Sequence, residues 1–412
     1  MQKLYNGLTE WCHENKLAIN CEVNKTEAII LKTGGEPSSE EEQPPQLKIN
    51  GQCIRYVKST KVLGVILDDE LNFELHANNK LIECKKKWGL ITKSTNRNKG
   101  LNTRSLTLLW KTMILTKLMY AAPIWLWKNM RTYKGFYQNA IMKITGSMLN
   151  PKRSLVELAM HLPPLEITLQ TLTVKFLCKV LSADDNLTSV LLQIEGSQPD
   201  YFHHLLTSIK EFIHWKYPDK FGRRTFTVDL LQLKEQDLSL HYSEGEIMCY
   251  QKHIWERLIT NQLSIAGSNP TNDNTSKLIS GIDDAIGFDR KDFLFNHGTS
   301  KREDSFILDY IHGNSLLFGN CRKRMQLGED RCYFCQKEED GPFHQLFMCE
   351  DVQDSTHSKL ISVIQNPLNY VQEVLIPNNQ EVQFQFIERI RFLMGQHDLV
   401  EELEKLKDKG QQ

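Results

Sequence analysis

The sequence predicts an α+β fold that is mostly helical, with a small β-hairpin region and a C-terminal cysteine–histidine knuckle. Short runs of β-type residues occur between residues 28 and 67, and the Asn50-Gly51 pair among them is a strong hairpin signal. Helical spacing of apolar residues dominates from residue 73 onward. Four residues of metal-binding type then cluster between Cys332 and Cys349.

The N-terminal segment is expected to combine one helix with four strands. The spacing of Leu4, Leu8 and Trp11 predicts a helix over Met1–Ala18. The expected strands are Ala28–Leu31, Leu47–Ile49, Ile54–Val57 and Val62–Leu67. The polar, acidic stretch 34–45 separates the first two strands and is expected to be a loop.

Helices are expected to account for most of the remaining chain. The predicted helices lie at residues 73–95, 103–122, 131–149, from Pro164 to about 182, 305–318 and 384–408. Gly100 and Pro123 mark the breaks between the first three. Residues 183–300 are mixed and acidic, and the Asn/Ser/Thr-rich stretch 266–277 within them is expected to be a loop.

Charge is distributed unevenly along the chain. The formal net charge is −1, yet residues 80–153 hold 16 Lys and Arg side chains against one acid, Glu83. This block carries about +15, which leaves about −16 for the rest of the chain. A basic block on an otherwise acidic protein suggests a polyanionic partner.

The sequence offers no sign of secretion or membrane insertion. The N-terminus lacks a basic-then-apolar signal, and the apolar stretch 106–127 is interrupted by Lys111 and Lys117, so no membrane partner is expected. Ten mostly scattered cysteines do not form the framework of a secreted, disulfide-rich protein. We expect an intracellular protein of the nucleus, the cytoplasm or both, in which the clustered cysteines bind metal.

The cysteine–histidine cluster has the spacing C-x2-C-x8-H-x4-C. Its members are Cys332, Cys335, His344 and Cys349. A two-residue gap lets both thiolates of a tight turn face one ion, and a His and a Cys five positions apart can share one face of a helical turn. Four ligands leave no open position, which predicts a structural zinc. The alternative is a pair of free, buried cysteines beside a surface histidine; Cys321 and His357 are outside candidates for the same ion.

Basic residues crowd the first two helices of the charged block. They include Lys85, Lys86, Lys87, Lys93, Arg97, Lys99, Arg104 and Lys111. A solvated helix face is the alternative, but the near-absence of acids favours binding of nucleic-acid phosphates. Trp88 and Trp110 lie among these residues and could stack on bases, although core packing is favoured for each.

Three stretches in a fixed order carry a resemblance. They are Trp11–Leu31 (WCHENKLAINCEVNKTEAIIL), Leu47–His76 (LKINGQCIRYVKSTKVLGVILDDELNFELH) and the cysteine–histidine cluster. Together they resemble the non-LTR (LINE-type, jockey-like) retrotransposon reverse transcriptases of animals, with the family's W-x3-N-x-L-x-I-N…K-T-E and I-N-G…K-Y-L-G-V-x-L-D…F-x-x-H segments and its C-terminal knuckle. Leu115–Trp127 and Leu162–Leu165 are similar to the family's thumb segment.

This resemblance implies the C-terminal half of such a polymerase and covers about residues 1–170 and 300–350. The implied domains are a palm remnant with a primer-grip-like hairpin (1–72), a basic helical thumb (73–182), a mostly helical connector (183–304) and a zinc-knuckle region with a terminal helix (305–412). RNA and DNA, as template and primer, are the implied partners.

The resemblance also implies roles for single residues. Leu63 and Gly64 match the hairpin that holds the primer end, and Lys25 matches the K-T-E lysine, implied to be a general acid. The family's two catalytic aspartates precede the Trp11 helix, and the chain begins too late to include them. Magnesium is therefore expected only if the missing palm is present.

Two departures from the family concern these positions. Four residues, where the family has two, separate Asn20 from Lys25, and Val62 stands where the family has Tyr. Three Asp-Asp pairs occur elsewhere and are expected to be helix-end or turn carboxylates rather than a polymerase centre. They are Asp68-Asp69, Asp184-Asp185 and Asp283-Asp284.

Three hypotheses follow. The first is a retrotransposon-derived fragment that binds nucleic acid but is inactive alone. The second is part of an active RNA-directed DNA polymerase whose upstream reading frame is missing. The third is a host-adopted nucleic-acid-binding or scaffold protein. The palm remnant's apolar helix face and sheet edge are expected to need a partner, for which the missing palm is the candidate.

Overall fold

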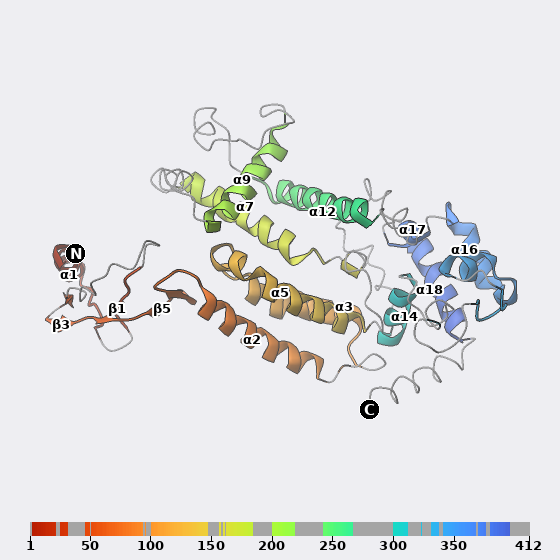
Figure 1. Ribbon diagram of the computed structural model, residues 1–412, viewed down its shortest axis with the longest axis horizontal. Helices are drawn as coiled ribbons and strands as arrows, with labels where there is room; N and C mark the ends of the chain where they lie inside the picture. Colours follow the sequence, from red (N-terminus) through yellow and green to blue (C-terminus); the bar gives the residue numbers. More distant parts are fainter. Residues whose placement is uncertain are drawn as a thin grey trace. The chain divides into compact units, whose positions relative to one another are not determined.

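The computed structural model is a mostly helical α+β chain, which confirms the predicted fold class (Figure 1). It describes residues 2–21, 25–31, 46–49, 51–93, 95, 100–146, 156–157, 160, 162–183, 200–218, 242–266, 300–311, 323, 331–337, 341–367, 370–375 and 380–395. The chain divides into two compact units. Unit 1 is Met1–Glu83 with Ile124–Asn129, and unit 2 is Cys84–Pro123 with Met130–Gln412.

Unit 1 contains one helix and three strand pairs, followed by the first part of helix α2 (Glu74–Thr92). Its elements are α1 (Gln2–Glu14), β1 (Glu27–Ala28), β2 (Lys48–Ile49), β3 (Gln52–Cys53), β4 (Arg55–Tyr56), β5 (Ser59–Val62) and β6 (Val65–Asp68). β1 pairs in parallel with β4, whereas β2–β3 and β5–β6 are antiparallel. Gly51, at φ 79°, lies in the β2–β3 turn, as the hairpin signal predicts.

The predicted single strand Val62–Leu67 is wrong, because the chain turns in the middle of it. Val62 pairs with Val65 across a two-residue turn formed by Leu63 and Gly64. Both turn residues have positive φ, 47° and 87°, as a type I′ turn requires. Glycine adopts this conformation without strain, while Leu63 is held in it with 86% of its surface exposed.

The core of unit 1 is small. Ala28, Leu47, Ile49 and Ile54 are buried together, with partly buried side chains packed around them. Several large apolar side chains on and after α1 stay about half exposed, namely Leu8, Trp11, Leu17, Ile30 and Leu31. That a partner covers this apolar surface stays a prediction.

Asp68 fixes the start of α2. Its Oδ1 accepts a hydrogen bond from the amide of Asn72 at 2.9 Å, and its Oδ2 accepts one from the amide of Phe73 at 2.7 Å. Phe73 is buried at a positive φ of 59°, which these bonds help to hold. Asp68 is thus a turn carboxylate, as predicted; the other two Asp-Asp pairs lie outside the described residues.

Unit 2 begins with the second part of α2 and continues through a bent helical segment. This segment is α3 (Thr103–Leu109), the π-helical turn η1 (Trp110–Leu115) and α4 (Thr116–Met119), and α5 (Ala122–Thr145) follows it. The predicted start of the last helix at residue 131 is wrong. Ala121, at φ 52°, forms the break, and Pro123 lies in the first turn of α5, where its missing N–H costs nothing.

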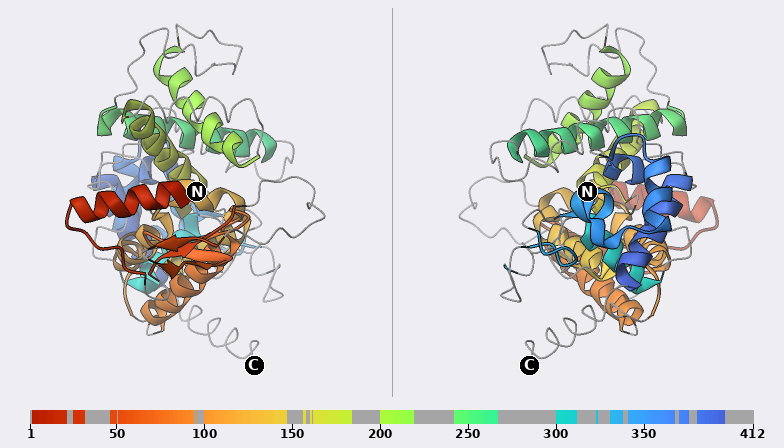
Figure 2. Two further views of the ribbon diagram at one scale, coloured as in Figure 1. Left: turned by 90° about the vertical axis from the view of Figure 1, so that its left-hand side faces the viewer. Right: turned by 90° about the vertical axis from the view of Figure 1, so that its right-hand side faces the viewer.

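Three long helices follow, α7 (Leu165–Ala183), α9 (Asp200–Lys216) and α12 (Glu244–Ala266). They lie side by side in both views of the chain (Figures 1 and 2), and α7 contacts the other two. Phe212 and Tyr250 are buried between α9 and α12 in an edge-on ring contact, with centroids 5.1 Å apart. Within the described part of the expected connector (183–304), α9 and α12 are helical, and the predicted loop at 266–277 lies almost entirely outside the described residues.

The C-terminal part of unit 2 is a group of short helices. They are α14 (Lys301–Ile311), η6 (His344–Met348), η7 (Glu350–Val352), α16 (Ser355–Val363), α17 (Tyr370–Leu375) and α18 (Gln380–Gly395). The right-hand view of Figure 2 faces this group, in which α18 packs against α14, α16 and α17. None of the helices within the described residues has the length and apolar character needed to cross a membrane.

Candidate metal centre and basic helical surface

Cys332 and Cys335 lie on a tight turn that is closed by backbone hydrogen bonds. The amide of Gln336 donates to Cys332 O at 3.0 Å, and the amide of Cys332 donates to Lys337 O at 3.0 Å. Gln336 has a positive φ of 56°, which reverses the chain direction after the second cysteine. The turn therefore brings both thiols to one side with local contacts alone.

His344 and Cys349 are brought together by a different device, the π-helical turn η6. The amide of Cys349 donates to His344 O at 2.7 Å, which closes a turn over five residues. In an α-helix, five positions would rotate the two side chains about 140° apart. The wider π turn returns them to the same side, which explains how an H-x4-C spacing can serve one ion.

The four predicted ligands form one group. Their ligand atoms all lie within 4.8 Å of one another. Cys332 Sγ is 3.9 Å from Cys349 Sγ, and Cys335 Sγ is 3.2 Å from His344 Nε2. Sulfur ligands about 2.3 Å from a tetrahedral zinc would be about 3.8 Å apart, so this donor set suits such an ion. The group could hold a metal ion.

Of the two further candidate ligands for this ion, the structure describes one. His357 is buried, and its Nε2 lies 3.3 Å from Phe347 O, so this ring is engaged with the backbone of the π turn rather than with the four ligands. Cys321 lies outside the described residues.

Burial dominates the electrostatics of the thiols. It raises the pKa of Cys349 to about 12, with a further contribution from the neighbouring Cys332. Burial also raises the pKa of Cys332. A bound cation would offset this cost, because metal ligation requires the thiolate form.

Sequence reasoning missed Arg389, a residue of α18 that supports the segment carrying two of the four candidate ligands. Arg389 on α18 is fully buried and donates hydrogen bonds to Gln345 O at 3.1 Å and to Val352 O at 2.7 Å. The sequence gives no clear signal for this role, because Arg389 lies between Glu388 and Arg391 in a charge-rich amphipathic helix. Such a position is normally read as the polar face.

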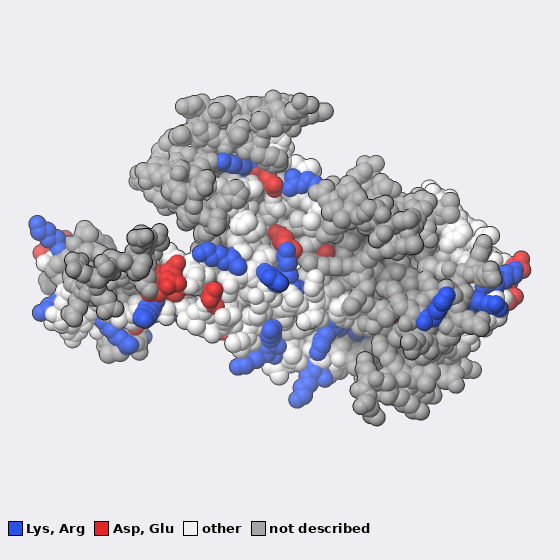
Figure 3. Space-filling view, in the orientation of Figure 1, with Lys and Arg blue, Asp and Glu red and all other residues white. Residues whose placement is uncertain are grey.

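The second candidate site is the basic surface of α2 and of the residues after it. Cys84, Trp88 and Thr92 recur every four positions and are buried. Lys85 and Lys86 lie on the other face and are exposed. The remaining predicted binding residues are Lys87 (half-buried), Lys93 and Arg104 (exposed) and Lys111 (half-buried). Figure 3 shows blue side chains gathered below α2 along the lower edge of the view.

Arg97 and Lys99 lie outside the described residues. From Cys84 to Arg153 the sequence contains no Asp or Glu, so no acidic residue within this stretch offsets the positive charge of its lysines and arginines. Positive charge of this density with exposed ammonium groups suits a polyanion such as a nucleic-acid backbone.

Trp88 and Trp110 lie in the core rather than on this surface. Trp110 is fully buried and Trp88 is 5% exposed. Their rings meet edge-on with centroids 5.2 Å apart, and Phe136 and Tyr137 pack on the far side of Trp110. The preference for core packing over base stacking is confirmed.

The residues with roles implied by resemblance occupy unit 1. Lys25 is exposed in the turn before β1, close to Thr26, whose hydroxyl donates to Asn20 O at 2.7 Å. Leu63 and Gly64 form the tip of the β5–β6 hairpin. The structure shows where these residues lie, but the roles that the resemblance implies for them stay predictions.

Comparison with known proteins supports a retrotransposon relationship. The chain is 25% identical over 130 residues to the Retrovirus-related Pol polyprotein from type-1 retrotransposable element R1 of Bradysia coprophila. The match covers 30% of this chain and only 12% of that polyprotein. No protein-family model and no solved structure matches the chain. The chain is therefore related to retrotransposon Pol proteins, at a level that leaves its own activity and partners to be proposed.

Proposed function

We propose that this chain is a retrotransposon-derived nucleic-acid-binding protein that corresponds to the thumb and knuckle end of an RNA-directed DNA polymerase. It binds the phosphates of RNA or DNA through the basic surface of α2 and α3, and it holds one structural zinc at its cysteine–histidine centre. The 412-residue chain binds without extending a primer. It acts inside the cell, in the nucleus, the cytoplasm or both.

The main support for nucleic-acid binding is the set of exposed lysines on one face of α2. Exposed lysines on α2 lie opposite a buried Cys84–Trp88–Thr92 face, within a stretch that has no acid. A helix of this kind exposes cations on a rigid support, which suits phosphate binding independent of base sequence. The similarity to a Pol polyprotein favours RNA and DNA as the polyanions.

Binding is tested by fluorescence anisotropy with labelled single-stranded RNA and with an RNA–DNA hybrid. The triple variant Lys85→Gln, Lys86→Gln, Lys93→Gln removes three exposed charges. The matched control replaces Lys179, Lys323 and Lys359, which are exposed lysines outside the basic block, by Gln. We expect at least a tenfold loss of affinity in the first variant and little change in the control. Equal affinities in both variants would refute the proposed surface.

A zinc ion would be held by Cys332, Cys335, His344 and Cys349, and it would supply a covalent cross-link between the two turns that carry them. The complete donor set, with three sulfurs and one imidazole nitrogen, favours a structural ion over a catalytic one.

A second candidate function is favoured by the β5–β6 hairpin. Its Leu63-Gly64 tip is exposed and sterically defined, as a primer-holding element of a larger polymerase would be. In that case the exposed apolar side chains of α1 would contact the polymerase's palm, and magnesium would act there. Primer extension by the chain alone, and with a palm portion of a related polymerase added in trans, separates the candidates. Extension only in the mixture would favour the second.

A further inference from the structure

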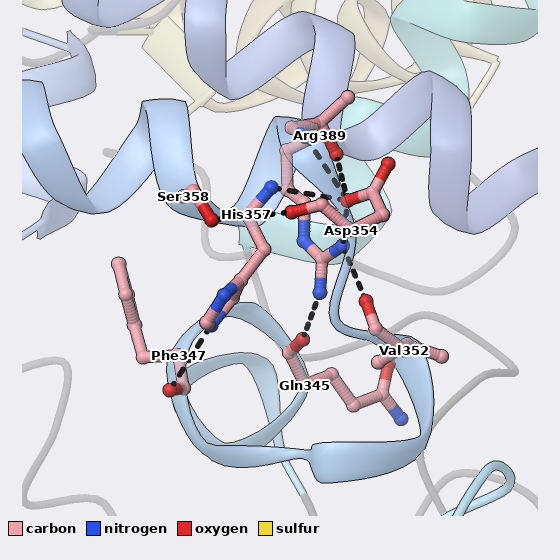
Figure 4. A network of polar contacts seen from close by, with 8 residues as sticks. Gln345, Phe347, Val352, Asp354, His357, Ser358 and Arg389 are labelled. Atoms are coloured by element: carbon pink, nitrogen blue, oxygen red, sulfur yellow. Dashed lines mark hydrogen bonds and ion pairs between the residues drawn. The ribbon is translucent and has the colours of Figure 1, made fainter.

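We infer that Arg389 is a positioning residue for the metal centre, which holds the His344–Cys349 half of the ligand set from the terminal helix α18. The inference rests on the proposed metal site, and it concerns how the chain prepares that site. It follows from the hydrogen bonds that surround the π turn (Figure 4).

The two halves of the ligand set differ in how they are supported. The Cys332–Cys335 turn is closed by its own backbone hydrogen bonds. The half formed by His344 and Cys349 is a π turn, a rare conformation that has its own backbone hydrogen bond from the amide of Cys349 to His344 O and also receives side-chain donors from α16 and α18. This half is therefore the one that neighbouring elements support.

Arg389 provides that support through one backbone carbonyl after each of the two ligands. Its Nη2 donates to Gln345 O at 3.1 Å, directly after His344, and its Nη1 donates to Val352 O at 2.7 Å, three residues after Cys349. One planar guanidinium thus binds the backbone directly after His344 and again shortly after Cys349. Figure 4 shows the side chain reaching from α18 toward these two carbonyls.

A third carbonyl of the same segment is held by His357. A carbonyl oxygen only accepts, so Nε2 of this ring carries the proton and donates to Phe347 O at 3.3 Å. Asp354 links the two supporting residues, because its Oδ1 accepts from Arg389 Nη1 at 3.1 Å and from the amide of His357 at 3.0 Å. The π turn is therefore held by one connected set of polar contacts.

The partners of the buried Arg389 guanidinium indicate that its hydrogen bonds support the π turn. The Arg389 side chain is fully buried, and a buried guanidinium is costly unless its donors are satisfied. Its two Nη groups donate to the Asp354 carboxylate and to the backbone carbonyls of Gln345 and Val352, whereas its Nε donates to none of the described residues. A lysine in its place has a single ammonium and cannot span both carbonyls in one plane.

Arg391 offers a matched control on the same helix. It pairs with Glu303 at 2.8 Å and with Glu388 at 2.6 Å. Neither partner belongs to the ligand segment. Replacement of Arg391 removes an arginine and two ion pairs from α18 while it leaves the carbonyls of the π turn untouched.

The test compares wild type, Arg389→Lys, Arg389→Met and Arg391→Met in the full chain. Zinc affinity is measured by competition with a chromophoric chelator, and the coordination sphere by the d–d and thiolate charge-transfer bands of the cobalt-substituted protein. We expect both Arg389 variants to lose about 10- to 100-fold in zinc affinity and to show altered cobalt bands, with Arg391→Met like wild type. Circular dichroism establishes which variants fold, and Arg389→Lys carries the test if Arg389→Met does not.

The outcomes separate this inference from the proposed metal site. If wild type binds neither zinc nor cobalt, the site itself is refuted. If wild type binds both and the folded Arg389 variants match Arg391→Met in affinity and spectrum, the site stands and the positioning role is overturned. A purely structural role would lower stability without altering the cobalt bands.

Discussion

The backbone amide of Thr103 donates a hydrogen bond to Asp304 Oδ2 at 2.9 Å, so a residue of α14 caps the start of α3 from 201 positions further along the chain. Both residues are fully buried. The same face of α14 joins the end of α5, where Ser305 Oγ donates to Gly146 O at 2.6 Å. Glu303, on the same helix, pairs with Arg391 of α18. Helix α14 thus connects the basic helices to the helical group around the metal centre within unit 2.

Loss of this cap should weaken unit 2. We predict that Asp304→Ala lowers the free energy of unfolding by about 1–3 kcal/mol, because it leaves the buried Thr103 amide without this acceptor. Asp304→Asn keeps an acceptor oxygen and should cost less. Urea unfolding at pH 7 measures both variants; equal stability of wild type and Asp304→Ala would show that the cap contributes nothing.

Lys301 is expected to make the stability of unit 2 depend on pH. Its side chain is almost fully buried and donates to Lys143 O at 3.2 Å. Burial lowers its pKa to about 8, against the opposing effect of Asp304. Between this pH and about 10.4, the ordinary lysine value, the unfolded chain binds more protons than the folded one, so stability rises with pH.

We therefore predict that wild type gains up to about 3 kcal/mol of stability relative to Lys301→Met as the pH rises from 8 to 10.4. Below pH 8 the difference in unfolding free energy between the two proteins should be constant. Lys301 is then charged in both the folded and the unfolded chain. Unfolding free energies at pH 7, 9 and 10 test this. A difference that stays flat across the range would mean that the buried lysine keeps its ordinary pKa.

Substitution of Trp88 distinguishes a role in core packing from a role in base stacking. Trp88→Phe should lower the free energy of unfolding by about 1–3 kcal/mol, because the smaller ring leaves a gap against Trp110. The folded variant should bind single-stranded RNA with unchanged affinity. A stacking role would instead cost about 1–3 kcal/mol of binding free energy, which anisotropy titrations would detect.

Cys349→Ser should abolish metal binding. We predict about one zinc per wild-type chain and none in the variant, with faster backbone hydrogen exchange over residues 331–352. Cys249→Ser replaces an exposed cysteine outside the centre and should retain the ion. Elemental analysis of both purified variants measures this, and zinc retained in Cys349→Ser would contradict the ligand assignment.

Much of this arrangement was predictable because it depends on local rules. Asn50-Gly51 indicates its hairpin by backbone conformation alone, and the C-x2-C and H-x4-C spacings indicate a shared ion by ligand chemistry. The burial of Trp88 follows from its four-residue spacing with Cys84 and Thr92 on one helix face.

The features that sequence reasoning missed depend on partners far along the chain. Arg389 and Asp304 acquire their roles from carbonyls and amides that only the fold brings near, and a single sequence does not identify such partners. The residue pattern hid the turn at Leu63 within an apolar run, and only the resemblance placed a hairpin at Leu63-Gly64. The π turn at His344 has no established sequence signature, so the spacing predicted a shared ion but not the backbone that provides it.

The most direct test of the central claim is the salt dependence of nucleic-acid binding. The logarithm of the dissociation constant for single-stranded RNA is measured against the logarithm of salt concentration, for wild type, for the Lys85/Lys86/Lys93→Gln variant and for the Lys179/Lys323/Lys359→Gln control. Each phosphate contact contributes about 0.7 to the slope. We predict a steep slope for wild type and control, reduced by about 2 in the first variant. A wild-type affinity that does not change with salt, or a slope that survives the loss of Lys85, Lys86 and Lys93, would contradict the claim that this chain binds nucleic acid through its basic helices.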